Sequence, residues 1–258
     1  MDSGKTSPDS PEVFTLAERP GLADRVGSLD PGRLPEFLRH DPINRDYWSR
    51  LYTELPEFQI GVLTGSGSES VVAAGYTAPV AMDPKRLPDR GWDAALEGAF
   101  RDREVGRRPN LLCALLAVVG AEHQRRGLSA LVLREMRKLA ARHGFDGLVA
   151  PVRPSLKHRY PLVPMERYAL WRREPDGLLF DPWLRTHERL GAQVVGVAPG
   201  SMEVTGAVAD WERWTEMSFP ESGEYVVEGA LNPVRIDRER DLGSYIEPNV
   251  WMIHKGTN

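Results

Sequence analysis

The distribution of apolar residues predicts a strand, a helix and a second strand in the middle of the chain. Residues 111–119 are apolar without interruption, which is typical of a central strand buried on both faces. Residues 128–142 carry apolar side chains on one helical stripe, and Gly144 is placed to end this helix in a left-handed conformation. Residues 145–152 predict the next strand. Because such a strand–helix–strand unit is right-handed, we expect its two strands to be parallel.

Further strands and helices are predicted on both sides of this unit. Residues 13–16 predict a short first strand, and residues 58–64 and 71–82 predict two strands joined by a Gly/Ser turn. Residues 92–100 predict a short helix with one apolar face. Residues 181–191 predict a helix that begins with an Asp-Pro pair and ends at a glycine.

The two ends of the chain differ in character. Residues 1–11 are rich in Ser, Pro and Asp and predict a disordered tail. Residues 193–198 and 201–208 alternate apolar and polar positions around a Pro-Gly pair, so we expect a hairpin there. Residues 225–231 and 245–254 predict a further β-ribbon. The whole pattern indicates an α+β protein with a mixed sheet.

Composition excludes several classes of function. The chain has 258 residues, of which 41% are hydrophobic and 27% are charged, as is ordinary for a protein with a substantial core. Its formal net charge of -4 argues against a general nucleic-acid-binding protein. The single cysteine, Cys113, lies in the apolar run and is expected to be buried. No apolar stretch has membrane-spanning length and the polar N-terminus lacks a signal-peptide core, so we expect a cytoplasmic protein with no membrane partner.

The segment that joins the apolar run to the amphipathic helix is the strongest candidate for chemistry. It reads Gln-Arg-Arg-Gly-Leu-Ser over residues 124–129, so two guanidinium groups, a glycine and the N–H groups of a helix start meet at one point. Such a point can bind a pyrophosphate. The segment lacks the Gly-Lys-Ser/Thr of a Walker loop and has only one glycine of a dinucleotide-binding fingerprint.

This segment resembles the acetyl-CoA-binding signature of the GNAT acetyltransferase superfamily, Gln/Arg-x-x-Gly-x-Gly/Ala. Gln124, Gly127 and Ser129 occupy its three positions, and the order of elements over residues 12–208 matches the family fold. The resemblance implies a mixed, mostly antiparallel, twisted sheet with helices on both faces. We expect a GNAT acyltransferase domain over residues 12–208 and a C-terminal β-ribbon extension over residues 209–258 that packs on the same domain.

The resemblance also implies how acetyl-CoA, or another short acyl-CoA, is held. The amides of residues 125–129 would bind the pyrophosphate, and the strand edge at residues 117–119 would pair with the pantetheine arm. A backbone N–H near Val119 would polarise the thioester carbonyl. The residues expected to bind this donor are Ala117, Val118, Val119, Gln124, Arg125, Arg126, Gly127, Leu128 and Ser129. No metal is expected.

Acyl transfer requires a base for the nucleophile and a proton for the leaving thiolate. Many GNAT enzymes supply the proton from a tyrosine four residues before a glycine. This chain has His187 at that position before Gly191, and an imidazole can act as acid or base near pH 7. Tyr160 and Tyr168 are further catalytic candidates, and the central strand offers no carboxylate as a base. The acceptor pocket is expected to include Trp48, His158 and Trp183.

Three functions remain open from the sequence, and in each case a homodimer is a possible assembly. The first is acyl transfer to a small amine. The second is transfer to a carrier-protein thiol, because the histidine and the inserted segments also resemble the GNAT-like loading domains of curacin-type polyketide synthases. Relatives of those domains decarboxylate malonyl-CoA with a histidine and a threonine, and here Ser155 is the nearest hydroxyl, which counts against decarboxylation. The third is a non-catalytic CoA-binding module.

Overall fold

The computed structural model describes residues 11–29, 34–64 and 70–256 and contains one nine-stranded sheet. The strands are β1 (Glu12–Thr15), β2 (Gln59–Leu63), β3 (Val71–Val80), β4 (Leu111–Val119), β5 (Gly147–Val152), β6 (Gln193–Gly206), β7 (Gly223–Tyr225), β8 (Val234–Asp237) and β9 (Leu242–Lys255). The α-helices are α1 (Ala23–Gly27), α2 (Pro42–Tyr47), α3 (Arg50–Glu54), α4 (Gly91–Glu104), α5 (Leu128–Arg142), α6 (Met165–Tyr168), α7 (Pro182–Arg189) and α8 (Val208–Thr215). Short 3-10 turns are η1 (Pro20–Leu22), η2 (Glu36–His40), η3 (Pro56–Phe58), η4 (Ala121–His123) and η5 (Lys157–Arg159). The predicted tail, apart from Pro11, and most of the predicted Gly/Ser turn lie outside the described residues.

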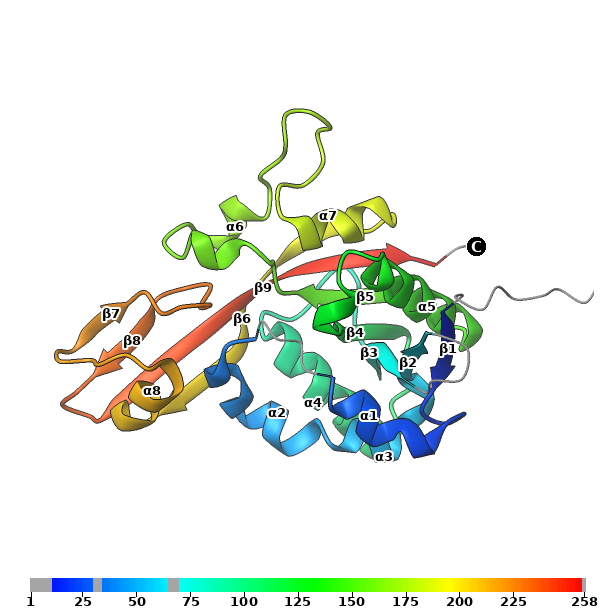
Figure 1. Cartoon of the computed structure of the whole chain (residues 1–258), viewed down its shortest axis with the longest axis horizontal. Helices are drawn as coiled ribbons and strands as arrows, with labels where there is room; N and C mark the ends of the chain where they lie inside the picture. The colour runs from blue at the N-terminus through cyan, green and yellow to red at the C-terminus, as the bar shows by residue number, and fades with distance from the viewer. Residues whose placement is uncertain (1–10, 30–33, 65–69, 257–258) are drawn as a thin grey trace, which may run out of the picture.

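The sheet is mixed and mostly antiparallel, as predicted. Its strand order is β1-β2-β3-β4-β5-β9-β8-β7, and β6 pairs with β9 outside this path. Among the described strands, only β4 and β5 pair in parallel, and every other pair is antiparallel. Figure 1 shows α5 and α7 on one side of the sheet and α1 to α4 on the other. The predicted fold class is therefore confirmed.

The predicted βαβ unit is confirmed, except that its second strand begins at Gly147 and not at Phe145. The strand β4 covers the whole apolar run, and Cys113 within it is completely buried. The apolar stripe of α5 lies on the sheet so closely that Val132 and Met136 would collide with a Cβ at Gly75. Gly144 ends the helix with a φ of +72°, the left-handed conformation expected of it.

The strand β4 separates from β5 shortly after the two begin to pair. Their parallel pairing ends at Cys113 and Val149. On its other edge, β4 has a bulge at Leu115, where its register with β3 shifts by one residue. Because a bulge bends the strand that carries it, residues 114–119 diverge from β5. This divergence creates the space for the site described below.

The hairpin predicted around Pro199 and Gly200 is wrong. Residues 193–206 form the single strand β6, and the Pro-Gly pair sits at a shift in its register with β9. The 14 residues of β9 offer a continuous partner, which overrides the local turn signal. The irregularity also places Ser201, whose Oγ accepts the N–H of Trp92 at 2.8 Å where α4 begins.

The C-terminal β-ribbon exists but uses different strands from those predicted. The segment over residues 225–231 is mainly a loop, because β7 ends at Tyr225. The apolar side chains of this loop are buried in the core, but its backbone does not continue the strand. The strand β9 contains all of the predicted segment 245–254 and lies between β5 and β6. Figure 1 shows β7, β8 and α8 at the far end of the long β6–β9 pair. Within the described residues, no helix is both long and apolar enough to cross a membrane.

Candidate active site

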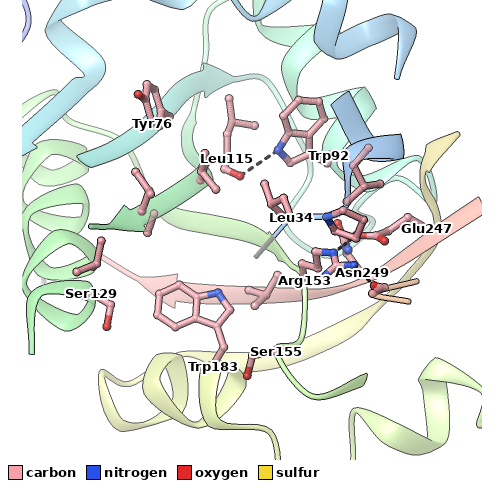
Figure 2. Close-up of a pocket in the computed structure, with 18 of the residues that line it drawn as sticks. Leu34, Tyr76, Trp92, Leu115, Ser129, Arg153, Ser155, Trp183, Glu247 and Asn249 are labelled. Atoms are coloured by element: carbon pink, nitrogen blue, oxygen red, sulfur yellow. Dashed lines mark hydrogen bonds and ion pairs between the residues drawn. The ribbon is translucent and has the colours of Figure 1, made fainter. Parts of the chain in front are cut away.

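A cavity of about 1770 Å³ opens where β4 and β5 diverge. Its walls come from these two strands, the start of α5, α7 and the inward side of β9. In Figure 2 the labelled residues run from Ser129 at one end, past Leu115 and Trp183, to Arg153 and Asn249 at the other. The volume exceeds that of ordinary small-molecule pockets, so the cavity can hold an extended donor and an acceptor together.

The Ser129 end of the cavity is suited to bind an anion. The helix α5 begins directly after Gly127, which provides no side-chain cap, so the N–H groups of the first turn keep their donor capacity. Positive φ angles at Arg125 (63°) and Gly127 (76°) turn the chain sharply at this point. These N–H groups and the positive end of the helix dipole together favour a phosphate.

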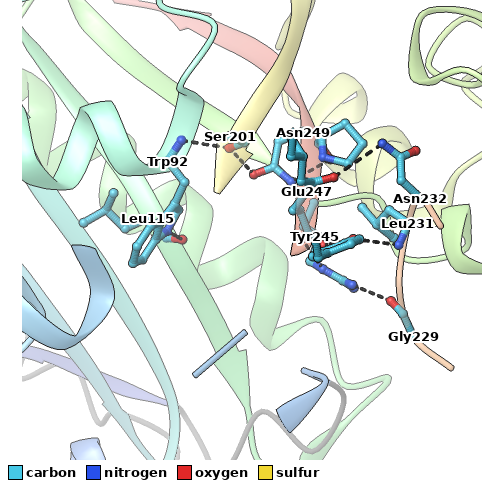
Figure 3. A network of polar contacts seen from close by, with 12 residues as sticks. Trp92, Leu115, Ser201, Gly229, Leu231, Asn232, Tyr245, Glu247 and Asn249 are labelled. Atoms are coloured by element: carbon cyan, nitrogen blue, oxygen red, sulfur yellow. Dashed lines mark hydrogen bonds and ion pairs between the residues drawn. The ribbon is translucent and has the colours of Figure 1, made fainter. Parts of the chain in front are cut away.

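The bulged part of β4 forms the wall beside the anion-binding end. The indole Nε1 of Trp92 donates to the carbonyl oxygen of Leu115 at 3.0 Å and holds the bulge in place (Figures 2 and 3). Beyond Cys113, β5 provides no ladder partner for this edge of β4. An extended ligand with amide groups can therefore add to the edge as a short strand would.

His187 lines the cavity from α7 and is only 1% exposed. Its Nδ1 lies 3.0 Å from Nε2 of His254 on β9, so one ring donates to the other and Nε2 of His187 remains for a ligand. Burial, together with the His254 ring, lowers the pKa of His187 to about 3. Burial and the charge of Arg137 lower the pKa of His254 to about 4. Both rings are neutral near pH 7, and Nε2 of His187 can accept a proton in the tautomer whose Nδ1–H donates to His254.

The structure brings most of the predicted site residues together in this cavity. Those that line it are Trp48, Ala117, Val118, Val119, Gln124, Arg125, Gly127, Leu128, Ser129, His158, Trp183 and His187. Arg126 is exposed on the loop and does not line the cavity. Among the described residues, no group of three or more His, Cys, Asp or Glu side chains is placed to hold a metal ion.

Tyr160 and Tyr168 do not line the cavity, so their placement does not support the predicted catalytic role. They pack with each other and with two more aromatic side chains outside it. The hydroxyl of Tyr168 donates to Oδ2 of Asp181 at 2.9 Å, and Asp181 caps the first turn of α7 as the sequence predicts. Their contacts therefore hold α7, which carries His187, in position.

Sequence reasoning missed the polar end of the cavity, which Figure 3 shows. Arg153 follows β5 directly and forms an ion pair with Glu247 of β9, with Nε 2.5 Å from Oε1, while its Nη2 donates to the carbonyl oxygen of Gly229 at 2.6 Å. Glu247 is completely buried and also accepts the hydroxyl of Tyr245 at 2.7 Å. Asn249 accepts a hydrogen bond from Ser201 Oγ at 2.6 Å. The available signal was the polar Glu-Pro-Asn sequence inside an otherwise apolar terminal strand.

A βαβ unit with an uncapped helix start, a bulged β4 and a divergent β5 defines a GNAT-type acyltransferase. No family model matches the sequence. A curated relative, arginine N-acetyltransferase avaD of Aspergillus versicolor, is 35% identical over 281 aligned positions, which cover 97% of this chain and 96% of the relative. The chain therefore belongs to the GNAT superfamily and is an acyl-CoA-dependent acetyltransferase.

Solved structures have the same fold. The loading GNAT-like domain of CurA from Lyngbya majuscula gives a TM-score of 0.60 at 18% identity, covering 96% of this chain and 98% of that domain. The GNAT-like decarboxylase GphF, solved with isobutyryl-CoA, gives a TM-score of 0.56 at 19% identity, covering 95% of this chain and 100% of its own. At such identities the likeness concerns the fold and leaves the acceptor open.

Proposed function

We propose that this acetyltransferase moves the acetyl group of acetyl-CoA to the α-amine of arginine or of a close arginine analogue. The proposal is carried by the 35% identity, along 97% of the chain, to a protein named as an arginine N-acetyltransferase. The cavity supports it, because an anion-binding loop, a neutral imidazole and a charged far end line one continuous space.

The donor would lie along β4. Its pyrophosphate would accept hydrogen bonds from the N–H groups of residues 125–129. Its pantetheine arm would pair with the free edge of β4 at residues 117–119. This placement brings the thioester to the opening between β4 and β5. N–H groups of the divergent strand would then donate to the thioester oxygen as it gains negative charge.

The acceptor would enter from the opposite end of the cavity. An arginine side chain stays protonated because its pKa is above about 12, so the α-amine is the group able to attack. Exposed carboxylates of Glu216 and Glu228 line this end and favour a cationic side chain.

His187 would accept and then donate the proton during transfer. The amine nitrogen attacks the thioester carbonyl carbon, and Nε2 of His187 takes one proton from that nitrogen as the C–N bond forms. When the tetrahedral intermediate collapses, the C–S bond breaks and the proton passes to the departing sulfur as CoA thiol. Because burial disfavours the imidazolium, His187 gives up this proton readily.

A thiol-release assay with acetyl-CoA and arginine, with the product identified by mass, tests the proposal. We expect His187→Ala to lower kcat by about 10² or more, the usual contribution of a positioned acid–base group. His143→Gln is the matched control, because His143 is exposed and does not line the cavity. Full activity of His187→Ala would refute the catalytic assignment.

The same assay separates the other functions considered. If a holo-carrier protein is acetylated and arginine is not, the acceptor is a thiol and not an amine. Tight CoA binding without turnover on either acceptor would indicate a binding module. A cytoplasmic location and a homodimer stay predictions from the sequence.

A further inference from the structure

The strongest unassigned feature of the cavity is the guanidinium of Arg153. We propose that Arg153 binds the α-carboxylate of the acceptor and so selects an amino acid over the corresponding amine without a carboxylate. This inference rests on the proposed function and adds the group by which the acceptor is recognised.

The Arg153 side chain is held in place and still has donors to spare. Its Nε is bonded to Glu247 and its Nη2 to the Gly229 carbonyl, so two elements far apart in sequence fix the plane of the guanidinium. Within the described residues, Nη1 makes no hydrogen bond, and the side chain remains 20% exposed to the cavity. A fixed guanidinium with a free edge suits a carboxylate, which it can bind through two parallel hydrogen bonds.

The ion pair behind this guanidinium is a costly way to stabilise a fold. Glu247 is completely buried, and the free-energy cost of removing its carboxylate from water offsets much of the free energy gained by pairing with Arg153. The hydroxyl of Tyr245 donates to its second oxygen, so Glu247 is satisfied without the ligand. A buried carboxylate that positions an arginine at a cavity wall is better explained by ligand recognition than by stability.

Arg153 also lies on a wall of the cavity that an acceptor carboxylate could reach. It comes directly after β5, whose last residues line the opening in which the thioester would sit. The α-amine and the α-carboxylate share one carbon atom, so the carboxylate anchor has to be close to the reaction centre. Figure 2 places Arg153 beyond Trp183, at the far end from Ser129, and therefore away from the phosphates of the donor.

The charge of Arg153 affects neighbouring groups in the cavity although Arg153 is paired with Glu247. Burial lowers the pKa of His158, and the positive charges of Arg153 and Arg159 lower it further. The wall beside His158 thus carries the positive charges of Arg153 and Arg159, whereas Glu216 and Glu228 at the mouth are negative. A zwitterionic α-amino acid with a cationic side chain fits both charges.

Kinetics with arginine and agmatine, which differ only by the carboxylate, test the inference. For the unaltered protein we expect kcat/KM for arginine to exceed that for agmatine by about 10- to 100-fold, the usual effect of a charged hydrogen-bonded pair. The double variant Arg153→Met with Glu247→Gln should bring this ratio close to one. It removes both charges together and so leaves no unpaired buried carboxylate, which protects folding.

Two single variants complete the comparison. Glu247→Gln keeps the guanidinium and should retain a clear preference for arginine. Arg172→Met is the matched control, because Arg172 is also paired with a glutamate, Glu188, but does not line the cavity. The control should keep the full arginine-to-agmatine ratio.

Three outcomes would overturn the inference, and they differ from one another. Equal kcat/KM for arginine and agmatine in the unaltered protein would mean that no carboxylate is recognised. A double variant that keeps the ratio but loses turnover of malonyl-CoA would assign the bound carboxylate to the donor. Transfer to neither amine would remove the proposed function, and the role of Arg153 with it.

Discussion

A buried pair of carboxyl groups, Asp41 and Asp93, should make the stability of this protein fall as pH rises. The side chains are 0% and 3% exposed, and Asp93 lies within hydrogen-bonding reach of Asp41. One oxygen of each, Oδ2 of Asp41 and Oδ1 of Asp93, has no ordinary hydrogen-bond donor, and one shared proton would satisfy both. Burial and the neighbouring Asp41 raise the pKa of Asp93 to about 8.

The size of the effect follows from this pKa. Between its ordinary value of 3.8 and about 8, the folded protein keeps a proton that the unfolded chain has lost. The free energy of unfolding therefore falls by about 1.4 kcal/mol per pH unit across this window. From pH 5.5 to pH 7.5, the loss is at most about 3 kcal/mol. Above about pH 8 Asp93 contributes no further slope.

The variant Asp93→Asn removes the titration and keeps a donor for Asp41. Urea unfolding of both proteins at several pH values between 5.5 and 8.5 gives the difference between their unfolding free energies. His187 and His254, which are buried with lowered pKa values, make stability rise with pH on the acid side in both proteins, so their effect cancels in this difference. As pH rises, the variant should become more stable relative to the unaltered protein. Asp46→Asn, which removes an exposed carboxylate from α2, should show no such trend. A flat difference for Asp93→Asn would refute the shared proton.

Three further predictions concern the cavity. His254→Gln should lower kcat about tenfold or more and displace the pH profile, with little change in KM for acetyl-CoA, because Nδ1 of His187 loses the ring that sets its tautomer; an unshifted profile would contradict this. Gly127→Ala should cost about 1 kcal/mol of stability and weaken CoA binding, because its φ of +76° is unfavourable for a residue with a Cβ; titration calorimetry showing unaltered affinity would oppose it. Trp92→Phe should lower kcat more than it raises KM, because the bond to the Leu115 carbonyl, worth about 1 kcal/mol, no longer holds the bulge; steady-state kinetics equal to those of the parent would refute that role.

The donor half of the site could be predicted because its signals are local. The apolar run, the loop at residues 124–129 and the stripe of α5 follow one another directly, so their order alone defines the strand, the turn and the helix start. The Asp181 cap and Gly191 likewise placed His187 on a helix. None of these assignments requires knowledge of which strands pair.

The polar end of the cavity, where we propose that the acceptor binds, could not be predicted because it depends on long-range pairing. Arg153 and Glu247 meet only because β9 pairs with β5, and no local pattern announces that pairing. The Pro-Gly pair in β6 gave a strong but misleading turn signal for the same reason. Tyr168 shows the reverse case, since its residue type suggested chemistry and its hydroxyl donates to Asp181 at the start of α7.

The terminal strand therefore contributes to the site as much as to the sheet. Two side chains that line the cavity, His187 and Arg153, each contact a buried partner on β9, which is His254 for the first and Glu247 for the second. In both cases the partner uses a nitrogen of the cavity residue and leaves another for the ligand. The proposed acceptor binding and proton transfer would thus both depend on the position of one strand, and a shift of β9 against β5 would disturb the two steps together.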